Sequence, residues 1–244
     1  MRKPELMDDP SLPAAEHRAA LRGLARINSV AMTNRVMASR VLAEVRRIAA
    51  ETPRAADTPV RVLDIATGGG DLPVAIALAA KAAGLNVRVH GCDFSPIALQ
   101  HAANLAAGKG AAVQWFSHDI VAADLPEQYD IITCGLFLHH LDEPEIVTVL
   151  ARLARATDGV LLVQDLQRSS LGLLMARVVP KLLTRSPVVH VDAVLSVQGA
   201  LTMNELESVA GKAGLLGATV TALFPQRMQL RYDAKQAAPA RRQA

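Results

Sequence analysis

Apolar residues recur in two patterns along the chain. Between residues 14 and 50 they are spaced three or four residues apart, as on one face of a helix. After residue 60, short apolar runs typical of strands buried on both faces alternate with helical patterns. We expect strands at residues 60–66, 87–93, 112–116, 129–134 and 160–164, and helices at 71–83, from 95 onward and at 142–155. Such alternation predicts a parallel sheet with helices on both faces.

The last third of the chain departs from this alternation. A mostly helical insert at residues 166–200 interrupts it, and a helix start returns at Thr202, where Glu205 completes a capping box. Strands expected at residues 218–223 and 227–232 lie too close together for a crossover helix, so they should form an antiparallel hairpin. The predicted fold is α/β and doubly wound, with a seven-stranded, mostly parallel sheet and an antiparallel last strand.

Three segments flank or interrupt the predicted domain, which spans residues 60–232. A linker at residues 53–59 separates it from an N-terminal helical arm at residues 1–52. The arm and the insert at 166–200 should both act as lids over the domain. Residues 233–244 are polar and Ala-rich, and we expect them to be a disordered tail.

Composition and charge narrow the class of protein. Apolar residues make up 51% of the 244, enough for a sizeable core. The net charge is +3, and Lys235, Arg241 and Arg242 of the tail account for much of it, so no basic, aromatic-lined face for nucleic acid is expected. No signal peptide or apolar run long enough to span a bilayer is evident. We therefore expect a cytoplasmic monomer or homodimer without stable membrane insertion.

The segment that follows the first strand carries the clearest chemical signal. Glycines at 68, 69 and 70 join the strand end to a helix that begins at Asp71, which lets a ligand approach the backbone and the helix N-terminus. A dinucleotide fingerprint would need a third glycine where Pro73 stands. The Asp71 carboxylate would also repel a pyrophosphate and suits a ligand with an amino group. A tight turn without a ligand is the alternative.

These residues resemble the first motif of the class I S-adenosylmethionine-dependent methyltransferases. The resemblance rests on the acid of Asp64 followed by Gly68 and Gly70, with Ala66 where the family's first glycine usually stands. Two later acids match as well: Asp93 implies a ribose ligand and Asp119 an adenine ligand. The resemblance implies S-adenosyl-L-methionine as cofactor, held by Asp64, Ala66, Thr67, Gly68, Gly70, Asp71, Asp93, Phe94, Ser95, Asp119, Ile120, Cys134, Gly135 and Leu136.

The fourth strand and the residues after it resemble the family's fourth motif. Cys134, Gly135 and Leu136 would line the methionine end of the cofactor, and His139 and His140 follow at the mouth of the cleft. A histidine can accept the proton of an acceptor hydroxyl at neutral pH, so these two are the candidate catalytic residues. Alternatively, they form hydrogen bonds within the fold.

Other candidates for chemistry are weaker. His190 and Asp192 lie in the insert and are candidates for the base if neither of the paired histidines serves. Asp142 and Glu143 could suggest a metal-dependent enzyme, but the capping role of Asp142 explains that pair, and no third ligand is evident. We predict no metal.

The arm and the insert are rich in apolar residues, which favours a small, hydrophobic acceptor, although core packing also accounts for them. Leu21–Asn28 ("LxxLxRIN"), "QDLQRS" at 164–169 and "HVDAVLSVQGALTMNEL" at 190–206 resemble bacterial small-molecule and quinone-pathway methyltransferases. This implies O-methylation of a lipophilic phenolic or hydroxylated metabolite of polyketide type. The alternatives are C-methylation of a quinone precursor, a catalytically silent cofactor-binding protein and an NAD-dependent oxidoreductase.

Overall fold

A seven-stranded sheet forms the centre of the computed structural model, which describes residues 5–9, 11–30, 32–51 and 57–241. Its strand order is β3-β2-β1-β4-β5-β7-β6. Only β7 runs antiparallel to its neighbours, β5 and β6, as the sequence predicts. The strands are β1 (Val60–Ile65), β2 (Val87–Asp93), β3 (Val113–Ser117), β4 (Tyr129–Gly135), β5 (Thr157–Leu166), β6 (Thr219–Leu223) and β7 (Arg227–Asp233).

Helices connect and cover the strands, and local sequence signals set where several of them begin. The Ser95 hydroxyl accepts the Ala98 N–H at the start of α4, and both predicted capping boxes, at Asp142 and Thr202, form. The helices are η1 (Leu6–Asp8), α1 (Ala14–Val30), α2 (Thr33–Glu51), α3 (Asp71–Ala82), α4 (Pro96–Lys109), η2 (Leu138–His140), α5 (Glu143–Arg155), α6 (Ser170–Leu183), α7 (Pro187–Gly199), α8 (Met203–Lys212) and α9 (Ala234–Arg241).

Successive side chains of the central strands face two separate cores. On β5, Val160 and Leu162 pack with residues of α2 and α3, whereas Leu161 and Val163 pack with residues of α5 and α8. Side chains alternate across a strand, so a strand that is apolar at every position must be covered on both faces. This double covering is the doubly wound arrangement that the sequence predicts.

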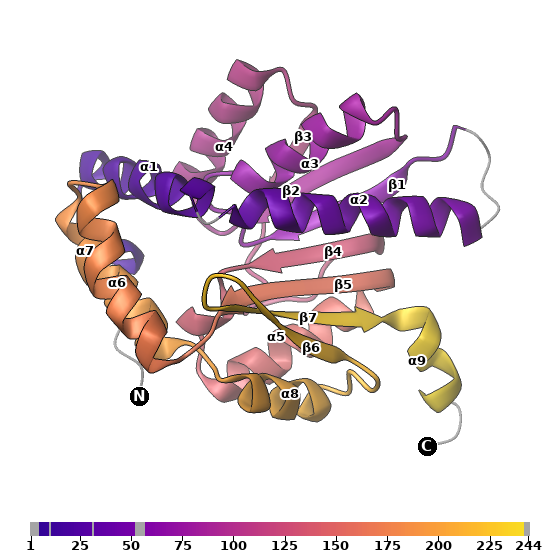
Figure 1. Ribbon diagram of the computed structural model, residues 1–244. Coiled ribbons are helices and arrows are strands. Elements are labelled where there is room, and N and C mark those ends of the chain that lie inside the picture. The colour runs from indigo at the N-terminus through magenta and orange to yellow at the C-terminus, as the bar shows by residue number, and fades with distance from the viewer. Residues whose placement is uncertain (1–4, 10, 31, 52–56, 242–244) are drawn as a thin grey trace.

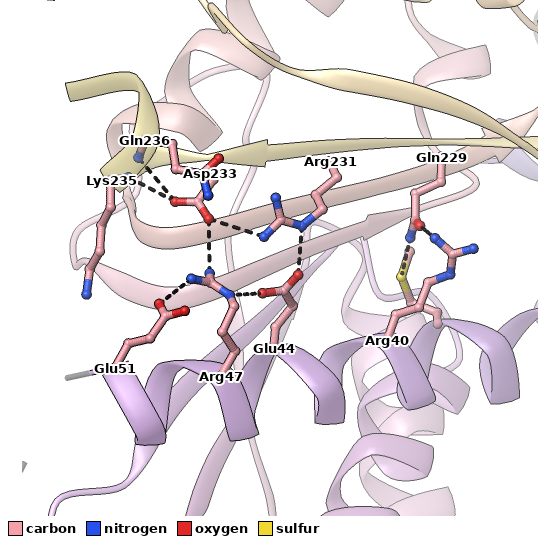
Figure 2. A network of polar contacts seen from close by, with 10 residues as sticks. Arg40, Glu44, Arg47, Glu51, Gln229, Arg231, Asp233, Lys235 and Gln236 are labelled. Atoms are coloured by element: carbon pink, nitrogen blue, oxygen red, sulfur yellow. Dashed lines mark hydrogen bonds and ion pairs between the residues drawn. The ribbon is translucent and has the colours of Figure 1, made fainter. Parts of the chain in front are cut away.

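The predicted N-terminal arm is two helices with different surroundings. They meet near Met32, which has a left-handed φ of 52°. Helix α2 packs an apolar face into the core of the sheet, and Figure 2 shows hydrogen bonds and ion pairs between α2 and β7. The Glu44 carboxylate bonds Arg231 of β7 at 2.7 Å, and Arg47 reaches Asp233 at 3.1 Å. Helix α2 therefore packs as a layer on the sheet, whereas the sequence analysis groups it with α1 in one arm.

Helices α1, α6 and α7 pack against one another, and η1 packs on α7. We call this group the cap. Figure 1 shows α1, α6 and α7 together beyond the carboxyl ends of β4 and β5. The prediction of a mostly helical insert at 166–200 agrees with α6 and α7. Across the described ranges, no helix is both long and apolar enough to cross a bilayer.

The C-terminal residues differ from the predicted disordered tail. Helix α9 begins at Ala234, and the Asp233 carboxylate accepts the N–H groups of Lys235 and Gln236. Ala237 is buried and belongs to the core that contains α5 and α8. A capped start and one buried apolar contact explain why this stretch is helical. Residues 242–244 of the predicted tail lie outside the described residues.

Candidate functional site

The loop after β1 alternates between ordinary and left-handed backbone. Ala66, Gly68 and Gly70 have φ values of 50°, 53° and 80°. Glycine adopts this conformation freely, whereas a residue with a Cβ is strained there by roughly 1–2 kcal/mol. The geometry explains the spacing of the two glycines, and it makes Ala66 a strained residue. The Thr67 N–H donates to the Cys92 carbonyl oxygen at 3.0 Å, which fixes the loop against β2.

The two loop glycines have different roles. A Cβ added at Gly68 would meet no atom within 4 Å, so Gly68 borders open space. A Cβ at Gly70 would lie 2.6 Å from the Ala102 Cβ and 2.8 Å from the Trp115 ring. Gly70 therefore allows α4 and β3 to pack closely against the loop, and Gly68 is the one that leaves room for a ligand.

Two buried acids stand at the carboxyl ends of adjacent strands. On β1, Asp64 accepts the Thr133 hydroxyl at 2.6 Å, and burial raises its pKa to about 7. On β2, Asp93 accepts the N–H groups of Gly68 at 2.8 Å and Ser95 at 2.9 Å, and burial raises its pKa too. Each acid therefore has a firm place in the fold, and Asp93 also closes the glycine loop.

Four further residues that the sequence analysis assigns to the cofactor differ in burial. Asp71 begins α3, and burial raises its pKa against the lowering charges of Lys109 and His101. The Phe94 side chain is 66% exposed. Asp119 is exposed, and its carboxylate accepts the N–H groups of the next turn, from Val121 at 2.9 Å and Ala122 at 3.3 Å. Ile120, beside it, is buried in the core.

The end of β4 provides only part of the predicted lining. The Cys134 side chain is fully buried and belongs to the core that contains α5 and α8. Gly135 does border open space, because a Cβ there would meet nothing within 4 Å. Leu136 has a left-handed φ of 55°, and its N–H donates to the Gln164 carbonyl oxygen at 2.8 Å. The open positions, Gly68 and Gly135, thus follow the neighbouring strands β1 and β4.

His139 forms a hydrogen-bonded pair with an acid that the sequence analysis did not single out. Its Nδ1 lies 2.6 Å from Asp165 Oδ1, and its backbone N–H donates to Oδ2 of the same carboxylate at 3.2 Å. Both side chains are buried. Burial alone would raise the pKa of Asp165, but the charge and hydrogen bond of His139 hold it below its usual value. The pair therefore favours an ionised carboxylate next to an imidazole with a fixed orientation.

The N-terminal segment reaches the same histidines. Glu5 Oε1 lies 3.7 Å from His139 Nε2 and 3.9 Å from His140 Nδ1, and it accepts the Ser196 hydroxyl. The buried Asp192 holds this segment on α7 by accepting the N–H groups of residues 6 and 7 at 2.8 and 3.0 Å. Asp192, a weaker candidate for the base, thus has a positioning role in the fold.

His190, the other weaker candidate, donates its Nε2–H to the Thr184 carbonyl oxygen at 2.8 Å, which is a contact within the insert. By contrast, Glu5, His139 and His140 bring one ligand atom each to within 4.8 Å of one another. Nitrogen and oxygen ligands of zinc lie roughly 2.0–2.2 Å from the ion, so these three would have to draw together to bind one. Among the described residues, this cluster is the candidate for holding a metal ion. The sequence analysis predicts no metal site.

Comparison with known proteins agrees with this geometry. Residues 62–158 match the model of a methyltransferase domain. The chain is 33% identical over 89 residues to a ubiquinone biosynthesis O-methyltransferase of Pseudomonas savastanoi, a match that covers 36% of each chain. It is 33% identical over 119 residues to the enzyme of the same name from Thiobacillus denitrificans, which covers 48% of each. The matched region thus spans between about a third and half of these curated relatives.

Solved structures match most of the chain at low identity. The plantazolicin methyltransferase BpumL, crystallised with S-adenosylhomocysteine, covers 89% of this chain and 90% of its own, with a TM-score of 0.64 and 15% identity. Magnesium protoporphyrin IX methyltransferase from Synechocystis, also with S-adenosylhomocysteine bound, matches 81% of this chain and 82% of its own. Its TM-score is 0.52 and its sequence identity 18%. Residues 62–158 thus match a methyltransferase domain, and the chain shares its Rossmann-like fold with these solved methyltransferases.

Proposed function

We propose that this chain is an S-adenosylmethionine-dependent methyltransferase that O-methylates a small, lipophilic phenolic or hydroxylated acceptor. The observation that carries the proposal is the His139–Asp165 pair, with Nδ1 and Oδ1 2.6 Å apart, just beyond the carboxyl end of β4. An O-methyltransferase needs a base at that place, and a histidine held by a buried carboxylate is suited to the task.

The residues around the glycine loop fit the cofactor. S-Adenosylmethionine supplies a methyl group that is already activated by a sulfonium. Gly68 and Gly135 border open space at two adjacent strand ends, and the first amides of α3 face the loop. The Asp93 carboxylate accepts two backbone N–H groups, and an ionised carboxylate has about four acceptor positions, so it retains room for the ribose hydroxyls.

Within this proposal His139 removes the acceptor proton. The Asp165 carboxylate accepts Nδ1–H, which leaves Nε2 as the nitrogen that receives a proton from the acceptor hydroxyl. The same carboxylate stabilises the imidazolium that forms. A phenol of pKa ~10 is only about one part in a thousand ionised at pH 7, so a positioned base should raise the rate roughly 10²–10⁴-fold.

The nature of the acceptor follows from the cap and from the relatives. The interior of the cap is a small apolar cluster in which Ala20, Val188 and Val189 are buried, with Leu24 and Ile27 packed against it. The curated relatives are O-methyltransferases of ubiquinone biosynthesis by name. Both points favour an aromatic hydroxyl on an apolar molecule. For the acceptor to reach His139 Nε2, the Glu5 carboxylate must move from its position 3.7 Å away.

The test is methyl transfer from isotopically labelled S-adenosylmethionine to a panel of alkyl-substituted phenols, catechols and hydroquinones, with the product analysed by NMR. A methyl group on oxygen supports the proposal. A methyl group on carbon would favour the quinone-precursor alternative. Saturable cofactor binding without transfer to any acceptor would favour a silent binding protein.

Variants of the pair separate the base from the fold. His139→Gln should lower kcat roughly 10²–10⁴-fold while cofactor affinity, measured by calorimetry, stays within a few-fold. Asp165→Asn should lower kcat as well and flatten its dependence on pH, because the amide cannot stabilise an imidazolium. His140→Gln is the matched control and should retain most of its activity. Turnover within a few-fold of wild type in His139→Gln would exclude His139 as the base.

A further inference from the structure

One face of α6 exposes a row of large apolar side chains. The exposed fractions are 54% for Leu171, 58% for Leu174, 48% for Val178 and 78% for Leu182. Their spacing of three and four residues puts all of them on the same side of the helix. We call this row the α6 stripe. Single exposed apolar residues are ordinary, but a contiguous row on a helix indicates a surface that binds a membrane or another molecule.

The α6 stripe lies in a segment without acids. Residues 166–191 contain no Asp or Glu, and they carry Arg177, Lys181 and Arg185 close to the stripe. None of these three forms an ion pair with another of the described residues. Arg26 of α1 lines the same surface hollow as Lys181 and Arg185, so α1 adds to the positive charge. Within residues 166–191, the charged side chains near the stripe are therefore all cations.

Another exposed apolar residue lies in a turn that is hydrogen-bonded to the residues before α6. Phe224, in the turn between β6 and β7, is 89% exposed. The same turn is bonded to the residues before α6: the Gln167 N–H donates to the Gln226 carbonyl oxygen at 3.0 Å, and the side chains of Ser169 and Gln226 are hydrogen-bonded. The turn that carries the exposed Phe224 thus lies beside the residues that precede α6.

We propose that the α6 stripe docks the protein on an anionic phospholipid surface, with α6 lying in the plane of the headgroups. An interfacial helix combines an apolar face, which enters the boundary of the acyl chains, with Lys and Arg at its border. The cations of this segment would meet the negative potential of such a surface. A second copy of the chain is a poorer occupant, because pairing two stripes would bring like charges together.

Docking in this orientation would turn the cap toward the lipid. Figure 1 shows α6 beside α1 and α7 at the end of the sheet where the strands β4 and β5 finish. If the acceptor is lipophilic, which rests on the proposed function, it could pass from the bilayer to His139 without crossing water. Binding to the surface itself does not depend on methyl transfer, so the two proposals can fail separately.

The test is co-sedimentation of the full chain with vesicles of phosphatidylglycerol and phosphatidylcholine, compared with vesicles of phosphatidylcholine alone. We expect binding to the anionic vesicles at 0.1 M salt and its loss near 0.5 M, where surface charges are screened. Leu174→Asp with Leu182→Asp should weaken binding at least ten-fold. Arg177→Glu with Lys181→Glu should do the same, since each cation contributes to attraction at the surface.

Two control variants change the same kinds of residue elsewhere. Leu216→Asp replaces an exposed leucine after α8, and Lys81→Glu reverses an exposed charge in the last turn of α3, near the amino ends of the strands. Both should bind vesicles like wild type. Failure of wild type to bind anionic vesicles, or equal binding by the stripe variants, would overturn the proposal. So would a dimer in sizing experiments that the Leu174→Asp, Leu182→Asp variant converts to a monomer.

Discussion

The sequence analysis predicts that helix α2 and the cap are accessory segments. In the structure, different contacts hold the two in place. Helix α2 buries Met37, Val41 and Ile48 almost completely against the sheet and adds ion pairs to β7. The cap has a small apolar cluster of its own, and α6 exposes Leu171, Leu174, Val178 and Leu182 while it buries Gly172, Ala176 and Pro180. Helix α2 extends the core of the sheet, whereas the cap packs mainly around its own small cluster.

The contrast teaches that a helix's position in the sequence does not decide whether it can move. Free energies of local opening are lowest where few apolar contacts would be broken. By that measure α2 should open only with the whole domain, whereas the cap, tied at its N-terminal end by the Glu5 and Asp192 contacts, can open alone. The expectations below test this division, from the largest effect to the smallest.

The largest difference should appear when apolar side chains are removed from the two regions. Ile48→Ala leaves a cavity under α2 and should lower the free energy of unfolding by roughly 2–5 kcal/mol. Leu174→Ala removes an exposed side chain of the cap and should change it by no more than about 0.5 kcal/mol. Urea denaturation of both variants measures the difference. Equal losses would show that the cap is as much a part of the core as α2.

A large pH effect is expected where the sheet meets the cap. Burial raises the pKa of Asp64 from 3.8 to about 7, so the folded state favours the protonated acid. Stability without ligand should therefore fall as pH rises from about 4 to about 7, by roughly 1.4 kcal/mol for each pKa unit. Asp64→Asn cannot ionise, so its Tm should exceed that of wild type at pH 8 but not at pH 4. A constant difference across this range would contradict the raised pKa.

A smaller effect is expected in the ionic contacts of α2. Burial would raise the pKa of Glu44, but its bonds to Arg231 and Arg47 hold the pKa below the usual value. Such a group stabilises the fold above its unfolded pKa, and the contribution is lost as pH falls through the folded pKa. Glu44→Gln should cost about 1 kcal/mol at pH 7 and almost nothing near pH 3. Glu51→Gln is the control, since Glu51 bonds the same Arg47 but is 53% exposed.

The smallest effect, but the most direct test, is the change in amide hydrogen exchange when S-adenosylhomocysteine is added. Protection should rise in α1, α6 and α7 when the ligand is present, because ligand contacts would add to the few that hold the cap. Protection in α2 should already be high and stay unchanged. A rise in α2 of the same size would mean that the predicted arm opens as one piece, with a hinge in the linker at residues 53–59.

Signals that act over a few residues were predictable from the sequence. Ser95, Asp142 and Thr202 begin their helices as expected, because an N-cap depends only on the next three residues. The mostly parallel sheet and the antiparallel hairpin of β6 and β7 followed from the alternation and from the short connection between those two strands. The break at Met32 was not predictable, since nothing marks a methionine as left-handed.

Contacts that depend on strand register were harder to predict. Asp165 was not singled out, although it follows a buried strand just as Asp93 does, and that signal could have found it. Its pairing with His139 becomes visible only once β4 and β5 are aligned, with Gly135 beside Gln164. The approach of Glu5 to both histidines depends on how η1 rests on α7, for which the sequence offers no local signal.

The packing around Gly70 has a consequence for spectroscopy. Trp115 is the chain's single tryptophan, and its ring lies against the positions where Gly70 and Gly91 lack a side chain. Indole emission depends on the polarity around the ring, so the tryptophan fluorescence of the unmodified protein comes from one known place beside the glycine loop. The molecule thus carries its own optical reporter of the loop, and neither a label nor an engineered residue is needed to follow it.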